Sequence, residues 1–142
     1  MTDVPPPAAP SRSGPEAAAP TRQTILVVDD EPGVRVMVAR MLTLSGYAVV
    51  SAQSGEEAIS IAQEYAAPLD LLLTDVRMPG MSGPELAQEL RKLRPEIKVM
   101  YMSAYARDVL PAGVQDSEVP FLNKPFTMRT LALSIVETLR RS

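Results

Sequence analysis

Acidic, hydroxyl and ammonium side chains follow directly after several short apolar runs of this 142-residue chain. They are Asp29, Asp30 and Glu31 after the run TILVV, Asp75 after DLLLT, Ser103 after IKVMYM, and Lys124 after FLN. Each has an ordinary explanation alone: an Asp before Pro32 is a good helix N-cap, and polar residues after strands are usually turn residues or solvated charges. Together they supply the carboxylates, the donor and the cation of one site, provided that the fold brings them to one place.

Three carboxylates in one site would require a counter-charge. At about 4 Å and an effective dielectric constant of about 20, two ionised carboxylates repel by about 4 kcal/mol. Mg²⁺ suits such a site, because it takes one or two carboxylates together with water and phosphate oxygens. With Lys124 as a second cation and Ser103 as a donor, one carboxylate can attack phosphorus while the cations neutralise the transferring group. The residue types therefore indicate formation of an acyl phosphate on an aspartate.

The composition excludes several other kinds of chemistry. The chain has no cysteine and no histidine, which excludes disulfides, thiolate zinc sites, cysteine nucleophiles, histidine triads and a phosphohistidine carrier. Its 14 basic and 17 acidic residues give a net charge of −3, so no basic field favours nucleic acid. Hydrophobic residues make up 46% and charged residues 22%, as in an ordinary globular domain.

The first 22 residues differ in composition from the rest. Six of the 14 prolines fall before residue 21, among alanines and small polar residues. Such a segment cannot bury enough apolar surface to offset an ordering cost of about 1–2 kcal/mol per residue. We therefore expect residues 1–22 to form a disordered tail and residues 23–142 to form one domain. The chain shows neither a secretory signal pattern nor an apolar run long enough to span a membrane.

The domain alternates β-rich apolar runs with helical periodicities. We expect strands over Thr24–Val28, Ala48–Ala52, Asp70–Thr74, Ile97–Met102 and Val119–Leu122. We expect helices over Pro32–Ser45, after the capping-box patterns at Ser54 and Ser82, and after a cap at Thr127. The apolar positions at helical spacing are Val34, Met37, Val38, Met41 and Leu44, then Ala58, Ile61, Ala62 and Tyr65, then Leu86, Leu90 and Leu93, and finally Leu131, Ile135 and Leu139.

Five strands with helices between them predict a doubly wound α/β fold, in which a parallel sheet is covered on both faces. The nearly unbroken apolar runs agree, because a strand buried on both sides has no polar face. Such sheets bind ligands at the carboxyl ends of their strands. This rule predicts that Asp29, Asp30, Asp75, Ser103 and Lys124 converge on one edge of the sheet.

Four motifs resemble one known family. They are VVDDE (Val27–Glu31), LLLTDVRMPGMSGPEL (Leu71–Leu86), VMYMSAY (Val99–Tyr105) and FLNKPF (Phe121–Phe126). In this order and at these intervals they resemble the receiver domain of two-component response regulators, over about residues 23–141. The residues of these motifs are most similar to those of receivers that stand alone or are attached to hybrid kinases. The resemblance implies a flavodoxin-like sheet with strand order 2-1-3-4-5.

The resemblance also implies a role for each residue of the site. Asp75 would be the phospho-acceptor. Asp30 would bind Mg²⁺ directly, Asp29 through water, and the backbone carbonyl of Arg77 would complete the protein ligands together with Asp75. Lys124, before a Pro125 that is often cis, would pair with the phosphoryl group.

The switch elements follow from the same resemblance. Ser103 would be the switch hydroxyl and Phe121 the switch aromatic residue, while Arg77 and Tyr105 would flank the phosphoryl site. The downstream partner would bind the face formed by the fourth helix, fifth strand and fifth helix. Pro111 and Gly113 disfavour a regular helix over residues 106–116, so we expect that segment to be short or irregular.

The resemblance implies a cytoplasmic domain that acts in signalling and catalyses only its own phosphorylation and dephosphorylation. Its partners would be a sensor histidine kinase or a histidine phosphotransfer protein and one downstream protein, with neither nucleic acid nor membrane. A phosphate sink, which mainly takes up and hydrolyses phosphoryl groups, is the alternative. The intact set of site residues argues against a vestigial binding module. A phosphatase of another α/β family would usually need a second Asp where Arg77 stands.

Overall fold

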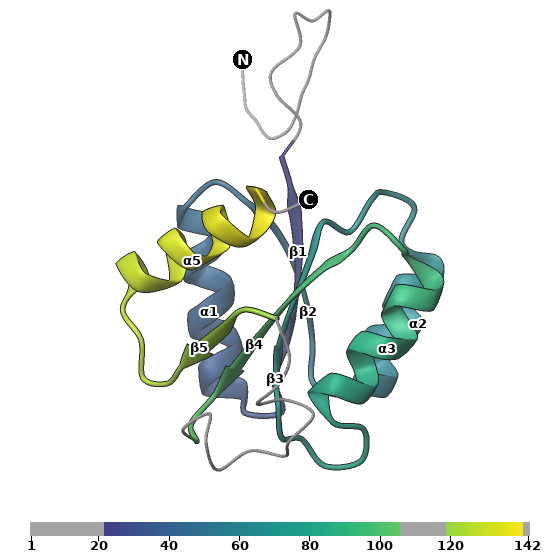
Figure 1. The fold of residues 1–142 in the computed structure, drawn as a ribbon. Helices are drawn as coiled ribbons and strands as arrows, with labels where there is room; N and C mark the ends of the chain where they lie inside the picture. Colours follow the sequence, from purple (N-terminus) through teal and green to yellow (C-terminus); the bar gives the residue numbers. More distant parts are fainter. Residues whose placement is uncertain (1–21, 106–118, 141–142) are drawn as a thin grey trace, which may run out of the picture.

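A computed structural model of the chain describes residues 22–105 and 119–140. These residues form a parallel sheet of five strands in the order β2-β1-β3-β4-β5, flanked by helices on both faces (Figure 1). The strands are β1 (Thr24–Val28), β2 (Ala48–Ala52), β3 (Leu71–Asp75), β4 (Lys98–Ser103) and β5 (Phe121–Asn123). The helices are α1 (Pro32–Leu44), α2 (Gly55–Glu64), α3 (Gly83–Leu93) and α5 (Met128–Arg140). The predicted fold class and strand order are confirmed.

Two predicted segments lie outside the described residues. The predicted tail, residues 1–22, has only Arg22 within the described part of the chain. The segment 106–116, with Pro111 and Gly113, falls entirely in the gap between residues 105 and 119.

The central strands are buried on both sides, as their continuous apolar runs predict. Every residue of β1 and β3 is buried, and successive side chains alternate between two cores because the side-chain period of a strand is two residues. Ile25 and Val27 face the core under α1 and α5, whereas Leu26 and Val28 face the core under α2 and α3. Figure 1 shows the two helix pairs on opposite faces of the sheet. Both cores hold the sheet rigid beneath its carboxyl edge.

The predicted helix starts are largely confirmed. Ser82 and Glu85 form a full capping box, and the hydroxyl of Thr127 accepts a hydrogen bond from the backbone N of Thr130 at 3.1 Å. The Ser54 side chain caps α2 by accepting from the backbone N of Glu57, but the Glu57 carboxylate reaches the N of Gln53 instead of closing the box.

The interpretation of Asp30 as a helix N-cap is wrong. Glu31 is the N-cap residue of α1, and no side chain caps this helix. Asp30 lies one residue before the cap and is exposed, so its carboxylate is available for another role.

Three residues predicted on buried helix faces are exposed: Met37, Leu44 and Leu93. In α1 the fully buried residues are Val38 and Leu42, which lie one helical turn apart. Leu44 follows Leu42 by two residues, which is about 200° around a helix with 3.6 residues per turn, and it is 70% exposed. Leu93 is the last residue of α3.

The strands β3, β4 and β5 each end one residue later than predicted, and this moves the site residues Asp75 and Ser103 into the sheet. Asp75 is the last residue of β3 and pairs with Met102, while Ser103 is the last residue of β4 and pairs with Asn123. The parallel ladder continues one position further than the apolar runs. Asp75 and Ser103 are therefore held by the backbone of the sheet instead of by a loop.

Candidate functional site

The end of β1 supplies two adjacent carboxylates in different environments. Asp29 is fully buried, whereas Asp30 is exposed. The carboxylate of Asp29 accepts a hydrogen bond from the backbone N of Glu31 at 2.9 Å, and the Arg35 guanidinium donates to the backbone O of Asp29 at 2.7 Å. Arg35 lies in the first turn of α1, so this bond fixes the turn that carries both carboxylates.

Asp75 lies at the end of the central strand β3 and is only 8% exposed. Its backbone O accepts a hydrogen bond from the Thr74 hydroxyl at 3.0 Å. Gly83, at the start of α3, packs against that same carbonyl so closely that a Cβ atom there would overlap it. A glycine at this position lets α3 approach the strand directly behind the acceptor residue.

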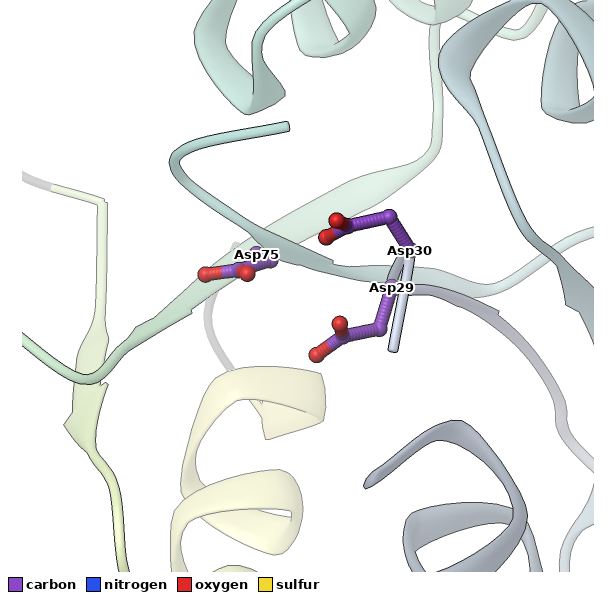
Figure 2. Close-up of side chains that lie close together, drawn as sticks. All are labelled: Asp29, Asp30 and Asp75. Atoms are coloured by element: carbon purple, nitrogen blue, oxygen red, sulfur yellow. The ribbon is translucent and has the colours of Figure 1, made fainter. Parts of the chain in front are cut away.

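The three aspartates gather at one place, as predicted. Carboxylate oxygens of Asp29, Asp30 and Asp75 all lie within 4.8 Å of one another. Figure 2 shows Asp29 and Asp30 reaching this place from the end of β1, and Asp75 reaching it from the end of β3.

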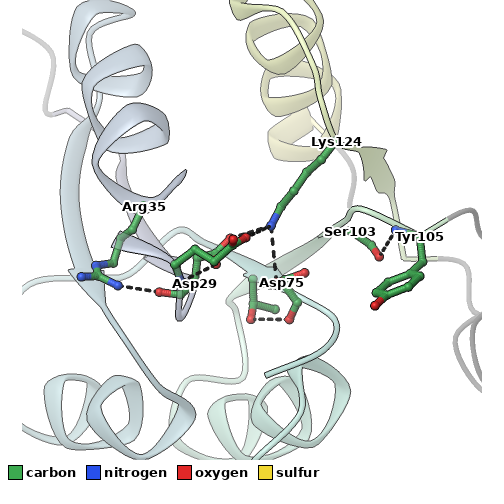
Figure 3. Close-up of polar contacts among 8 residues, drawn as sticks. Asp29, Arg35, Asp75, Ser103, Tyr105 and Lys124 are labelled. Carbon is green, nitrogen blue, oxygen red and sulfur yellow. Dashed lines mark hydrogen bonds and ion pairs between the residues drawn. The ribbon is translucent and has the colours of Figure 1, made fainter. Parts of the chain in front are cut away.

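Lys124 bridges the acidic residues from the segment after β5 (Figure 3). Its Nζ lies 2.8 Å from Oδ2 of Asp29, 3.4 Å from Oδ2 of Asp75 and 3.9 Å from Oε1 of Glu31. The side chains of Lys124, Asp29 and Asp75 are at most 11% exposed, so the ion pairs of Lys124 with the two aspartates are largely shielded from water, whereas the Glu31 side chain is exposed. The peptide bond between Lys124 and Pro125 is cis.

One lysine does not neutralise this cluster. Burial raises the pKa of Asp75 from 3.8 to about 6; Lys124 opposes the shift, and the charges of Asp29 and Asp30 add to it. Burial alone would lower the pKa of Lys124, but its hydrogen bond to Asp29 and the charges of Asp75 and Asp29 outweigh burial and raise it. Lys124 therefore stays charged, and the site still carries excess negative charge.

The donor set fits Mg²⁺. Carboxylate oxygens are the ligands that this hard cation prefers, and three of them lie within reach of one ion. Burial, and after it the charges of Asp29 and Asp30, raise the pKa of Asp75 and so disfavour its ionised form, which a bound cation would stabilise.

Ser103 and Tyr105 form the rim of the site on the β4 side. The Ser103 hydroxyl accepts a hydrogen bond from the backbone N of Tyr105 at 2.9 Å, as Figure 3 shows. The Arg77 guanidinium lies over the Tyr105 ring, with Cζ 4.6 Å from its centroid, which is a cation–π contact. Arg77 and Tyr105 are exposed, so this pair covers the rim from the solvent side.

Phe121 opens β5 and is partly buried against the core under α2 and α3. It pairs in register with Tyr101 of β4. The switch residues Ser103 and Phe121 thus lie on neighbouring strands.

Three residues in contact with the site were not predicted from the sequence: Arg35, Gly83 and Asn123. The Asn123 side chain donates to the backbone O of Tyr105 at 3.0 Å. Each acts on a backbone atom of a site residue, and no motif based on side-chain chemistry marks such contacts.

Comparison with known proteins agrees with this geometry. The family model described as "Response regulator receiver domain" matches residues 25–136. The chain is 43% identical over 119 residues to the sensor kinase CckA of Brucella abortus (strain 2308), covering 83% of this chain and 13% of that protein. It is 34% identical over 116 residues to the response regulator receiver protein CpdR of the same organism, covering 81% of this chain and 95% of CpdR. The chain thus spans a small part of one relative and nearly all of the other.

Solved structures show the same likeness. The receiver domain of the hybrid histidine kinase CckA superposes with a TM-score of 0.70 at 39% identity, covering 82% of this chain and 99% of that one. The response regulator TrrA of Thermotoga maritima, solved in complex with Mg²⁺–BeF, gives a TM-score of 0.69 at 31% identity, covering 82% and 98%. Among the helices that the structure describes, none is long and apolar enough to cross a membrane.

Proposed function

This chain belongs to the response regulator receiver family, and on that premise we propose that it is a phosphorylation switch whose acceptor is Asp75. The observation that carries the proposal is the position of the Asp75 carboxylate, which lies 3.4 Å from Lys124 and within 4.8 Å of Asp29 and Asp30. It is the one aspartate of the three that ends the central strand and faces both the cation and the acidic pair. The phosphoryl donor is the phosphohistidine of a sensor kinase or of a phosphotransfer protein.

In the proposed reaction a carboxylate oxygen of Asp75 attacks phosphorus. An O–P bond forms as the N–P bond to the donor imidazole breaks, and the imidazole keeps the electron pair and takes a proton from water. The Lys124 ammonium donates to the phosphoryl oxygens, and the Ser103 hydroxyl turns toward them. Asp30, Asp29, Asp75 and the carbonyl of Arg77 would hold Mg²⁺, which when bound supplies positive charge to the transferring group.

Phosphorylation of Asp75 changes the surface of the domain through movements of Ser103 and Phe121. Movement of the Ser103 hydroxyl toward the phosphoryl group vacates space on β4, and Phe121 on the neighbouring strand turns into it. This changes the surface formed by β5 and α5. We propose that the downstream protein binds there, where Leu133 and Val136 of α5 expose apolar side chains.

A phosphate sink is the alternative within the same family, and the two functions differ in the lifetime of the phosphorylated state. Arg77 and Tyr105 favour the switch, because their contact covers the rim of the site and restricts the approach of hydrolytic water. We further propose that residues 23–142 form one receiver domain and residues 1–22 a tail, and that the chain acts in the cytoplasm beside the kinase.

The test is phosphorylation of the purified chain by a small acyl phosphate in millimolar Mg²⁺, followed by intact mass. Wild type should gain one base-labile phosphoryl group, and Asp75→Asn should gain none. Asp70→Asn is the matched control: Asp70 lies just before β3, at the opposite end of the strand, and accepts a hydrogen bond from the backbone N of Thr24, so this variant should be labelled like wild type. Equal labelling of Asp75→Asn and wild type would refute the assignment of the acceptor.

A further inference from the structure

A side-chain hydrogen bond joins the end of β5 to the segment that follows β4. The Nδ2 atom of Asn123 donates to the backbone O of Tyr105 at 3.0 Å. β4 and β5 are adjacent, with Ser103 opposite Asn123 in the parallel register, and the backbone N of Lys124 donates to the O of Ser103 at 2.8 Å. The two strand ends that carry Ser103 and Lys124 are therefore tied together by one backbone bond and one side-chain bond.

Tyr105 is held at three points by groups from three elements. Asn123 of β5 holds its carbonyl, Ser103 of β4 accepts from its N–H at 2.9 Å, and the guanidinium of Arg77, which follows β3, lies 4.6 Å from its ring centroid. Figure 3 shows the Ser103 hydroxyl oxygen turned toward the Tyr105 amide. The position of the Tyr105 backbone thus determines in which direction the Ser103 hydroxyl must point to accept the hydrogen bond from the Tyr105 N–H.

This arrangement opposes movement of Ser103. When the hydroxyl turns toward a phosphoryl group on Asp75, it leaves the Tyr105 N–H unless the Tyr105 backbone moves with it. Asn123 resists that movement, because it anchors the carbonyl of the same residue to β5. A polar group that loses its hydrogen-bond partner costs free energy, so the anchor makes the turn of Ser103 less favourable.

We propose that Asn123 is a positioning residue that restrains the Tyr105 backbone and, through it, holds the Ser103 hydroxyl in its unphosphorylated orientation. The inference rests on the proposed function, in which Ser103 turns toward phosphorylated Asp75. Asn123 contacts neither the acceptor carboxylate nor Lys124 Nζ among the described contacts, so it acts on the phosphorylation rate only through the ease with which Ser103 turns toward the phosphoryl group.

The variant Asn123→Ala tests the restraint, and because Asn123 is exposed the fold should tolerate it. Phosphorylation by acetyl phosphate in saturating Mg²⁺ should become about two- to tenfold faster, the factor expected for loss of one ordinary hydrogen bond. Exchange of the Tyr105 amide proton, measured by NMR in the unphosphorylated protein, should accelerate by a similar factor. A purely structural loss would lower the phosphorylation rate instead of raising it.

Thr127→Ala is the matched control. It removes the exposed hydrogen bonds of the Thr127 hydroxyl to the backbone N and the hydroxyl of Thr130. Thr127 lies three residues after Lys124 in the sequence, and among the described contacts it has none with Tyr105. Both rates should stay at their wild-type values in this variant.

The outcomes separate the restraint from the proposed function. A phosphorylation rate in Asn123→Ala that is unchanged or lower overturns the restraint, and so does an unchanged Tyr105 exchange rate. If wild type accepts no phosphoryl group at all, the proposed function fails, while the exchange measurement on the unphosphorylated protein still decides whether Asn123 restrains Tyr105.

Discussion

Replacing the acceptor by its neutral isostere, Asp75→Asn, should stabilise the Mg²⁺-free protein. The pKa of Asp75 is raised from 3.8 to about 6 by burial and by the neighbouring aspartates, after allowance for the opposing effect of Lys124. Each unit of pKa difference between the folded and unfolded states corresponds to 1.36 kcal/mol. Holding Asp75 ionised in the fold at pH 7 therefore costs about 3 kcal/mol, and the variant removes this cost.

The gain should depend on pH in a defined direction. Because the pKa of Asp75 is higher in the folded state, the folded state binds the proton more tightly than the unfolded chain does. Well below pH 3.8 the carboxyl is protonated in both states, so wild type and variant should be equally stable there and differ little at pH 4. The difference should grow as the pH rises through about 6 and reach its full size near pH 7.

Urea denaturation followed by circular dichroism, in EDTA between pH 4 and pH 7.5, measures this difference. At pH 7 the variant should be more stable by about 3 kcal/mol, or about 10 °C in melting temperature for a domain of this size. Asp70→Asn should give no such gain, because it weakens an acceptor of the Thr24 N–H. A gap that is missing at pH 7, or that is equally large at pH 4, would refute the electrostatic argument.

Two further predictions follow from the same site. Mg²⁺ at ten times its dissociation constant should raise the free energy of unfolding of wild type by about 1.4 kcal/mol, because the ion binds only the folded state. Asp30→Asn should lose most of this gain, as measured by thermal denaturation. An equal gain in both proteins would show that Asp30 does not bind the ion. Shortening Arg77 and Tyr105 to Ala, together, should speed loss of the phosphoryl group severalfold without blocking phosphorylation, as followed by mass after removal of the donor. An unchanged half-life would mean that the contact between these two side chains does not shield the site.

The chain by itself was enough to predict the sheet and the membership of the site. Continuous apolar runs such as TILVV and LLL are typical of strands buried on both sides, and the helical segments between them favour parallel neighbours. The carboxyl ends of parallel strands share one edge, so Asp29, Asp75 and Lys124 were predicted to meet before any distance was known. The structure places them within 2.8–4.8 Å of one another.

Local capping patterns were also readable, within limits. The pattern at Ser82 closes a full capping box, because all its partners lie within one helical turn. At Ser54 the same pattern forms only half of the box, since the Glu57 carboxylate accepts a hydrogen bond from the backbone N of Gln53 instead of from that of Ser54. Such a choice between neighbouring donors depends on the direction from which the chain enters the helix.

Only the tertiary structure decided which of two adjacent aspartates is buried, how one lysine is shared, and which backbone atoms are anchored. Asp29 and Asp30 are identical in type, adjacent in sequence and both placed after the last residue of β1, but Asp29 is enclosed and Asp30 faces water. The contact of Asn123 with Tyr105 spans 18 residues and arises from the register of β4 against β5. Periodicity and residue type determine which face of an element is apolar, whereas the direction of a single polar side chain depends on atoms that only the packed strands bring within hydrogen-bonding distance.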